Sequence, residues 1–113
     1  MAMDTRHAVA TIRLHGKLDL TGGQTQAALE QYADPATGFQ AGVWTSQPYT
    51  ATVNYDTPEF CYLLEGEVRL TDAAGRVETY RAGDAFVIPA GFSGTWESVT
   101  AVRKFYTVAE PAR

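Results

Sequence analysis

The sequence has few of the residues that mark the commonest special classes of protein. Cys61 is its only cysteine, so an internal disulfide is excluded and nothing indicates an oxidising compartment. No run of 18 apolar residues occurs, and the first residues contain no apolar segment of signal-peptide length. Neither a membrane span nor export is therefore expected, and the predicted location is the cytoplasm.

Positive charge is also scarce. Nine Lys and Arg residues stand against 13 Asp and Glu, which gives a formal net charge of -4, and the cations form no run. A nucleic-acid-binding protein would carry a basic patch, so neither nucleic acid nor an anionic membrane is an expected partner. With 45% hydrophobic residues among 113, the chain is expected to fold as a globular domain.

Short strand patterns, each bounded by turn residues, follow one another after Gly38. In residues 59–71 the even positions are apolar and most odd positions are polar, which is the period of two of a strand with unequal faces. Cys61 and Leu63 break this polarity, so the first half of the strand is predicted to be buried on both sides. Some eight short strands without a long helix between them predict an all-β fold, with a double-sheet jelly roll as its architecture.

The first 38 residues are predicted to form an N-terminal extension that packs on, or pairs with, a barrel made by residues 39–113. Residues 8–14 alternate loosely and are interpreted as an edge strand. Residues 24–32 are rich in helix-forming side chains and follow Thr21, a possible cap, so they predict a short helix or turn.

Two glycine-punctuated runs resemble the signature motifs of the cupin superfamily. The run EFCYLLEG at residues 59–66 has the glutamate and glycine of the first motif, and GDAFVIPAG at residues 83–91 has the Gly-Asp turn and the Pro-x-Gly of the second. The surrounding residues look like the small single-domain cupins related to the cupin domain of (S)-ureidoglycine aminohydrolase. This resemblance implies a cupin-type jelly-roll barrel.

The same resemblance shows where metal ligands would be expected. Cupins that bind a metal carry two histidines before the motif glutamate and a third histidine three residues after the last motif glycine. Only the glutamate, Glu59, is kept, and Gly94 stands at the third histidine's position. The first pair corresponds to Thr52 with Asn54, or to Val53 with Tyr55, depending on the spacing.

The chain has only two histidines, His7 and His15, and both precede the barrel. A first-row metal bound through imidazole and carboxylate usually needs at least three protein ligands. We therefore expect no metal and no other cofactor, unless the N-terminal segment folds into the mouth of the barrel.

Glu59 and Lys104 are the candidate catalytic residues. If Glu59 faces the interior, desolvation would raise its pKa and make it a candidate acid or base. The alternative is a structural ion pair with Lys104 or Arg103 across the sheet. Alternation places Lys104 and Tyr106 on one face of their strand. An inward Lys104 would receive a substrate carboxylate or bridge Glu59, and the alternative is a solvated pair at a sheet edge.

The barrel has many aromatic residues for its size. They are candidates for stacking on a flat or sugar-like ligand and for hydrogen bonding to it, although such residues more often form the core. Cys61 is interpreted as an inert buried thiol. The candidate ligand-binding residues are Trp44, Tyr55, Tyr62, Trp96 and Tyr106.

The predicted function is the binding of a small polar metabolite inside the barrel without a metal. A homodimer is expected because a jelly-roll barrel of this size exposes a sheet face that needs covering. The alternative is an enzyme, either similar to ureidoglycine aminohydrolase or another small-molecule hydrolase or isomerase, with Glu59 as its acid or base.

Overall fold

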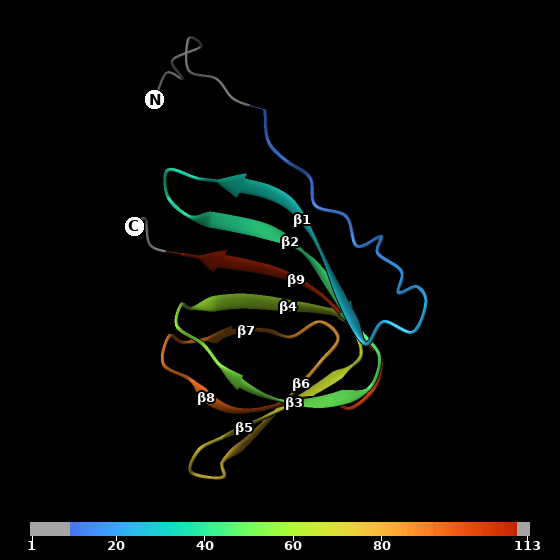
Figure 1. Ribbon diagram of the computed structural model, residues 1–113, viewed down its shortest axis with the longest axis vertical. Coiled ribbons are helices and arrows are strands. Elements are labelled where there is room, and N and C mark those ends of the chain that lie inside the picture. Colours follow the sequence, from blue (N-terminus) through green and yellow to red (C-terminus); the bar gives the residue numbers. More distant parts are fainter. Residues whose placement is uncertain (1–9, 111–113) are drawn as a thin grey trace.

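The computed structural model describes residues 10–110, which form nine strands and no helix (Figure 1). The all-β prediction is therefore confirmed. No helix in this part of the chain is long and apolar enough to cross a membrane. The strands are β1 Gln26–Asp34, β2 Phe39–Ser46, β3 Tyr49–Asn54, β4 Glu59–Glu65, β5 Glu67–Asp72, β6 Val77–Arg81, β7 Ala85–Ile88, β8 Ser93–Ser98 and β9 Val102–Ala109.

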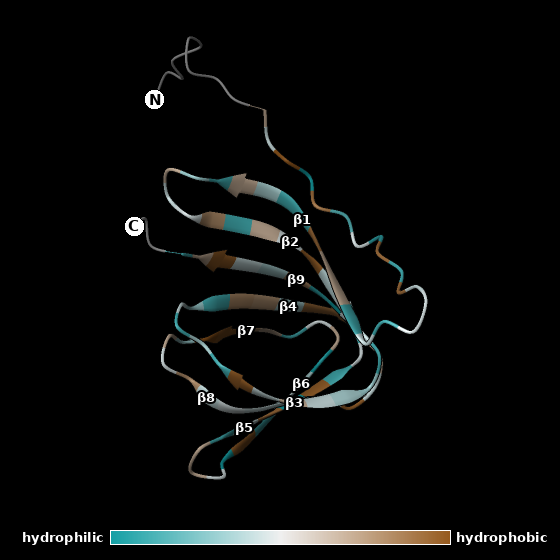
Figure 2. Ribbon diagram, viewed as in Figure 1, coloured by the Kyte–Doolittle hydropathy of each residue, from teal (hydrophilic) through white to brown (hydrophobic). Residues whose placement is uncertain are grey.

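Two antiparallel sheets face each other. One has the strand order β1-β2-β9-β4-β7 and the other has the order β3-β8-β5-β6. Apolar stretches occur on strands of both sheets (Figure 2), as expected where each sheet buries one face against the other. The fully buried core side chains include Val43, Leu63, Val68, Ile88 and Val102. This arrangement is the predicted double-sheet jelly roll.

Gly66 divides the run that the sequence presents as one strand. Before it, β4 buries the odd positions Cys61 and Leu63, whereas after it β5 buries the even positions Val68 and Leu70. Gly66 has φ +94°, a conformation that glycine adopts without strain, and it carries the chain from one sheet to the other. The prediction that the first half of this run is buried on both faces is wrong, because its even positions face outward.

Substituting Gly66 with alanine is expected to destabilise the fold by about 3 kcal/mol, since the left-handed backbone alone costs about 1–3 kcal/mol. An added Cβ would also collide with the carbonyl oxygen of Ala101. Gly75→Ala is the matched control, because Gly75 has φ +85° but nothing lies within 4 Å of its Cβ position. Urea unfolding should show the larger loss for Gly66→Ala, and equal losses would contradict the role of the collision.

The helix predicted for residues 24–32 is wrong. Gln26–Asp34 forms β1, which pairs with β2 along its length with one irregularity between Glu30 and Tyr32. Helix propensity is a weak preference, and the open edge of β2 offers a row of hydrogen-bonding groups that outweighs it. In the predicted edge strand at residues 8–14, residues 8 and 9 lie outside the described residues, and residues 10–14 are not in a strand.

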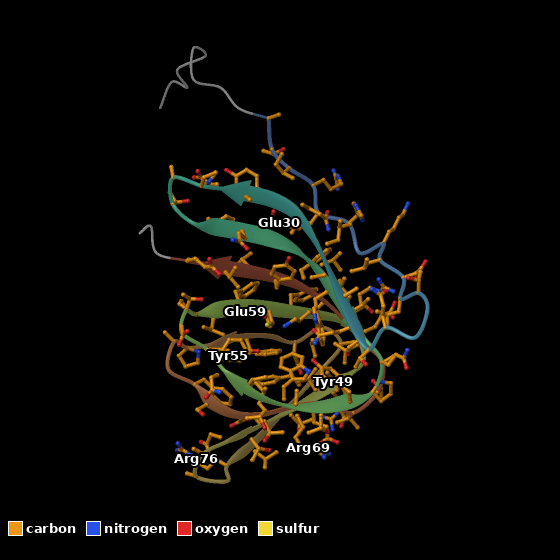
Figure 3. All side chains as sticks on the ribbon, in the orientation of Figure 1. Glu30, Tyr49, Tyr55, Glu59, Arg69 and Arg76 are labelled. Atoms are coloured by element: carbon orange, nitrogen blue, oxygen red, sulfur yellow. The ribbon has the colours of Figure 1, made fainter. Side chains whose placement is uncertain are left out.

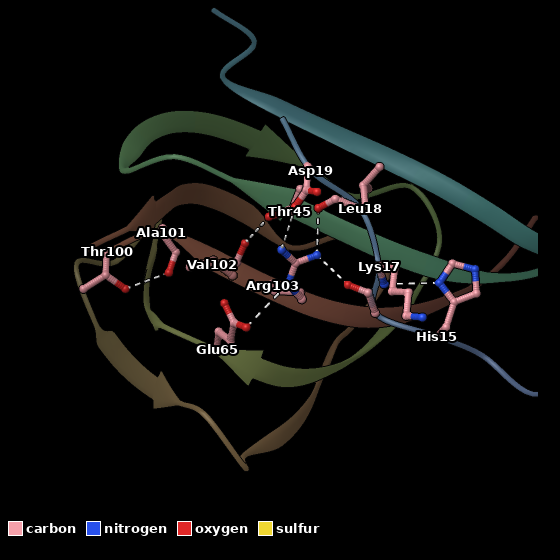
Figure 4. A network of polar contacts seen from close by, with 11 residues as sticks. His15, Lys17, Leu18, Asp19, Thr45, Glu65, Thr100, Ala101, Val102 and Arg103 are labelled. Carbon is pink, nitrogen blue, oxygen red and sulfur yellow. Dashed lines mark hydrogen bonds and ion pairs between the residues drawn. The ribbon is translucent and has the colours of Figure 1, made fainter. Parts of the chain in front are cut away.

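Arg103 attaches the segment before β1 to the outer face of the five-stranded sheet. Its guanidinium donates hydrogen bonds to the carbonyl oxygens of Gly16 and Leu18 at 2.5 and 2.7 Å (Figure 4). The carboxylate of Glu65 lies 3.7 Å from the same guanidinium. Arg103 is therefore the outward cation of its strand.

The outer face of the five-stranded sheet also exposes apolar side chains. Phe60 on β4 and Val87 on β7 are directly paired across the two strands, and they are 43% and 59% exposed. Such a patch is of the kind that often marks an interface. The expected homodimer and the expected cytoplasmic location stay predictions.

Candidate functional site

A cavity of about 450 Å³ lies between the two sheets. Its walls come from β1, β2, β4 and β9 of one sheet and from β3 and β8 of the other, together with the residue that follows β3. Figure 3 shows Tyr49, Tyr55 and Glu59 at this place. The lining residues are Gln26, Ala28, Trp44, Tyr49, Ala51, Thr52, Val53, Tyr55, Glu59, Trp96, Lys104, Tyr106 and Val108.

A buried ion pair joins β4 and β9 in the wall of this cavity. The Nζ atom of Lys104 lies 2.6 Å from Oε2 of Glu59, and the two side chains are 6% and 14% exposed. Because β9 alternates without interruption, Lys104 and Tyr106 lie on one face of the strand, as the sequence predicted, and both line the cavity. Of the alternatives for Lys104, the structure therefore shows the bridge to Glu59 and not a solvated pair at a sheet edge.

Two indole rings surround the ammonium group of Lys104. Nζ lies 4.9 Å from the ring centroid of Trp44 and 4.4 Å from that of Trp96, and the two rings meet edge to face. Such contacts attract a cation to the face of an aromatic ring. Both indole N–H groups are also engaged, since Trp44 donates to Gln26 at 2.7 Å and Trp96 donates to Ser98 at 2.9 Å.

Cys61 completes the surroundings of the ion pair. Its thiol donates to Oε2 of Glu59 at 3.1 Å, and Lys104 donates to its Sγ atom at 3.4 Å. Burial raises the pKa of Cys61 from 9.0 to about 12, and the nearby Lys104 opposes this shift only in part. The thiol is therefore protonated at neutral pH, which agrees with an unreactive cysteine.

The stability of the protein is expected to fall as the pH rises above about 9. The folded state holds the proton of Cys61 up to a pKa of about 12, whereas the unfolded chain releases it near 9.0. Unfolding then releases a proton, so alkaline conditions favour the unfolded state. The raised pKa of Lys104 acts in the same direction, because burial lowers it but the interactions with Cys61 and Glu59 outweigh that effect.

Urea unfolding of the wild type and of Cys61→Ala between pH 7 and pH 10 measures how much the thiol contributes to this pH dependence of stability. The difference in unfolding free energy between the two proteins should shrink as the pH rises through this range. Parallel curves would show that the thiol proton makes no contribution.

Three tyrosines offer hydroxyl groups near the cavity. Tyr49, Tyr55 and Tyr106 line it, and no hydrogen bond within residues 10–110 involves their hydroxyls. Burial raises the pKa of Tyr55 to about 12, so this hydroxyl keeps its proton and remains a donor. Tyr62 does not belong to the group, because it lies on the outward face of β4 and is 38% exposed. Placing Tyr62 in the cavity was an error caused by the reversal of alternation at Gly66.

The donor set does not fit a cupin metal centre. Thr52 reaches the cavity and Tyr55 lines it, but neither supplies an imidazole. His15 is exposed on the segment before β1, where its Nδ1 accepts a hydrogen bond from the backbone of Lys17, and His7 lies outside the described residues. Within residues 10–110 no three His, Cys, Asp or Glu side chains come together as metal ligands do. The cation beside Glu59 is an ammonium group of the chain itself.

Sequence reasoning missed some residues of the site. Gln26, which accepts a hydrogen bond from the indole N–H of Trp44, lies in the segment that the sequence predicted as a helix. Asp56 and Glu110 line a second hollow that shares Glu59 and Tyr55 with the cavity. No motif in the sequence around either residue indicates that it belongs to a site.

Comparison with known proteins gives a consistent result. A model of the EutQ-like cupin domain matches residues 33–106. A Pseudomonas syringae protein of unknown function from the DUF861 family is 32% identical over 74% of this chain, with a TM-score of 0.68. This chain spans only 36% of that protein's length. No curated protein matches the sequence.

Two further solved structures are similar. A candidate ethanolamine utilization protein Q (EutQ) from Salmonella typhimurium is 26% identical, with coverage of 78% of this chain and 71% of its own, and a TM-score of 0.66. A DUF861 family protein from Thermotoga maritima is 34% identical, with coverage of 57% and 73% and a TM-score of 0.55.

Proposed function

The chain belongs to the EutQ-like cupin domain family, and from this premise we propose that it binds a small polar metabolite in the cavity between its sheets, without a metal. The observation that carries the proposal is the cavity itself, where aromatic walls surround one buried ion pair. Small-molecule sites are typically concave and mostly apolar, with a few placed polar groups. A cavity of about 450 Å³ falls within their usual size.

The geometry also supports a second candidate, an enzyme that uses Glu59 as acid or base. Oε2 of Glu59 contacts both Lys104 and Cys61, whereas Oε1 has no hydrogen-bond partner within residues 10–110. A free carboxylate oxygen at a cavity wall is suited to exchange a proton with a ligand. The resemblance to ureidoglycine aminohydrolase gains no support from the relatives found, so the reaction class is left as hydrolysis or isomerisation of a small molecule.

A thermal-shift screen of small polar metabolites tests the proposal. A ligand at one hundred times its Kd should stabilise the folded state by about 2.7 kcal/mol, because it binds only that state. Each variant is compared with its own ligand-free melting temperature. Glu59→Gln and Tyr55→Phe should reduce the shift, whereas Glu78→Gln, an exposed carboxylate on β6, should leave it unchanged.

Tyr55→Phe separates binding from stability, because it removes one hydroxyl and keeps the ring. Hits that raise the melting temperature of the wild type and of all three variants equally would place binding elsewhere and contradict the cavity as the site. Incubating each hit with wild type and Glu59→Gln, followed by mass spectrometry of the ligand, distinguishes turnover from binding.

A further inference from the structure

The two charged groups of the cavity differ in their remaining capacity for hydrogen bonds to a ligand. Lys104 is 5% exposed, and its ammonium group is surrounded by Glu59, Cys61 and two indole faces. Glu59 uses only one of its two oxygens in contacts with described residues, although a carboxylate has about four acceptor positions. The charged group with free bonding capacity is therefore an anion.

The surroundings of the cavity are negative as well. A second hollow of about 380 Å³ shares Tyr55, Glu59 and Val108 with it and contains no cation. The two spaces together contain the carboxylates of Asp56, Glu59 and Glu110 and the single ammonium of Lys104, a net charge of -2. A carboxylate or phosphate ligand would meet this excess of like charge and would find no free cation.

The cavity also contains neutral hydrogen-bond donors, which are tyrosine hydroxyls. The hydroxyls of Tyr49 and Tyr55 have no partner in the described part of the chain, and burial raises the pKa of both. They remain donors toward a hydroxyl or carbonyl oxygen of a ligand. The aromatic walls next to them would cover its apolar part.

Building on the proposed function, we propose that the ligand is a small organic ammonium compound whose N–H groups donate to the free oxygen of Glu59. The faces of Trp44 and Trp96 already hold Lys104, so they do not form an open aromatic cage for the ligand's charge. Recognition therefore depends on N–H donors, and the site favours a primary amine over a quaternary ammonium, which has none.

Four compounds that share one ring but differ in charge or in N–H donors test this proposal: benzylamine, benzyltrimethylammonium, benzyl alcohol and benzoate. Binding is measured by calorimetry at pH 7 and low salt, and its position is read from the two indole N–H signals of the protein in NMR spectra. Benzylamine should bind on the order of tenfold more tightly than benzyl alcohol, as expected for a charge-assisted hydrogen bond worth about 1.4 kcal/mol more. Benzyltrimethylammonium should bind more weakly than benzylamine, and benzoate most weakly.

Variants then assign the preference to the carboxylates. Glu59→Gln should remove the advantage of benzylamine over benzyl alcohol, and Asp56→Asn should reduce it, whereas Glu78→Gln should preserve it. Asp56 is exposed, so its variant tests charge without disturbing the core.

The outcomes separate this inference from the proposed function. If benzyl alcohol or benzoate shifts the indole signals and binds as tightly as benzylamine, the cavity is a ligand site but its preference for ammonium is overturned. Equal benzylamine affinity in wild type, Glu59→Gln and Asp56→Asn would overturn it too. If no compound binds and the metabolite screen yields no hit, the proposed function fails and this inference fails with it.

Discussion

Replacing Lys104 with methionine is expected to reduce the free energy of unfolding by about 3–5 kcal/mol, because removing one partner of a buried ion pair leaves the other charge uncompensated. Glu59 would retain only the thiol of Cys61 at Oε2, with its side chain still mostly buried. The variant also loses the contacts of the ammonium group with two indole rings. Methionine keeps the approximate volume of the side chain, so the loss would report charge and not a large void.

A double-mutant cycle in urea measures this coupling. Glu59→Gln with Lys104→Met should be less destabilised than the sum of the two single variants, since the double variant buries no unpaired charge. Lys17→Met is the control, because Lys17 is exposed. Additive losses would mean that the ion pair is not the source of the effect, and a Lys104→Met variant as stable as wild type would show that Glu59 finds another partner.

The parts of the site on uninterrupted strands could be predicted from the sequence. β9 runs from Val102 to Ala109 without a bulge against β4 as far as Lys104, so alternation placed Lys104 and Tyr106 correctly on one face. Alternation failed for Tyr62, because hydropathy does not reveal that Gly66 turns the chain into the other sheet. Local patterns give the phase of a strand only between such interruptions.

The non-local parts of the site could not be predicted. β1 exists because β2 offers a hydrogen-bonding edge, and its own side chains are mostly exposed and favour a helix as much as a strand. Gln26 was therefore not associated with Trp44, although the two residues lie 18 positions apart in a simple hairpin. Asp56 follows a strand and Glu110 follows the last one, where a polar residue normally indicates only solvent exposure.

Gly94→His restores the residue type that the cupin resemblance places at this position, and it is expected to destabilise the fold by about 3 kcal/mol or more, at or above the usual cost of overpacking. A Cβ atom at Gly94 would collide with the carbonyl oxygen of Thr71 and lie 3.1 Å from Cα of Asp72. These are backbone atoms of β5, which is hydrogen-bonded to β8, so they can give way only if the sheet shifts. Gly94→Ala should therefore show most of the same loss in urea unfolding.

Thr52→His is the matched comparison, because Thr52 is exposed on β3, where exposed positions alternate with the partly buried Ala51 and Val53, so the strand accepts a larger side chain there. It should fold with nearly wild-type stability, and neither variant should gain thermal stability from Zn²⁺ or Ni²⁺, since one imidazole and Glu59 fall short of three ligands. If Gly94→His folds normally and Zn²⁺ raises its melting temperature, the spacing of β5 and β8 is pliable and the carboxylate can leave Lys104 for a metal. If the loss is found as expected, glycine at this position is a requirement of the close packing of β8 against the backbone of β5.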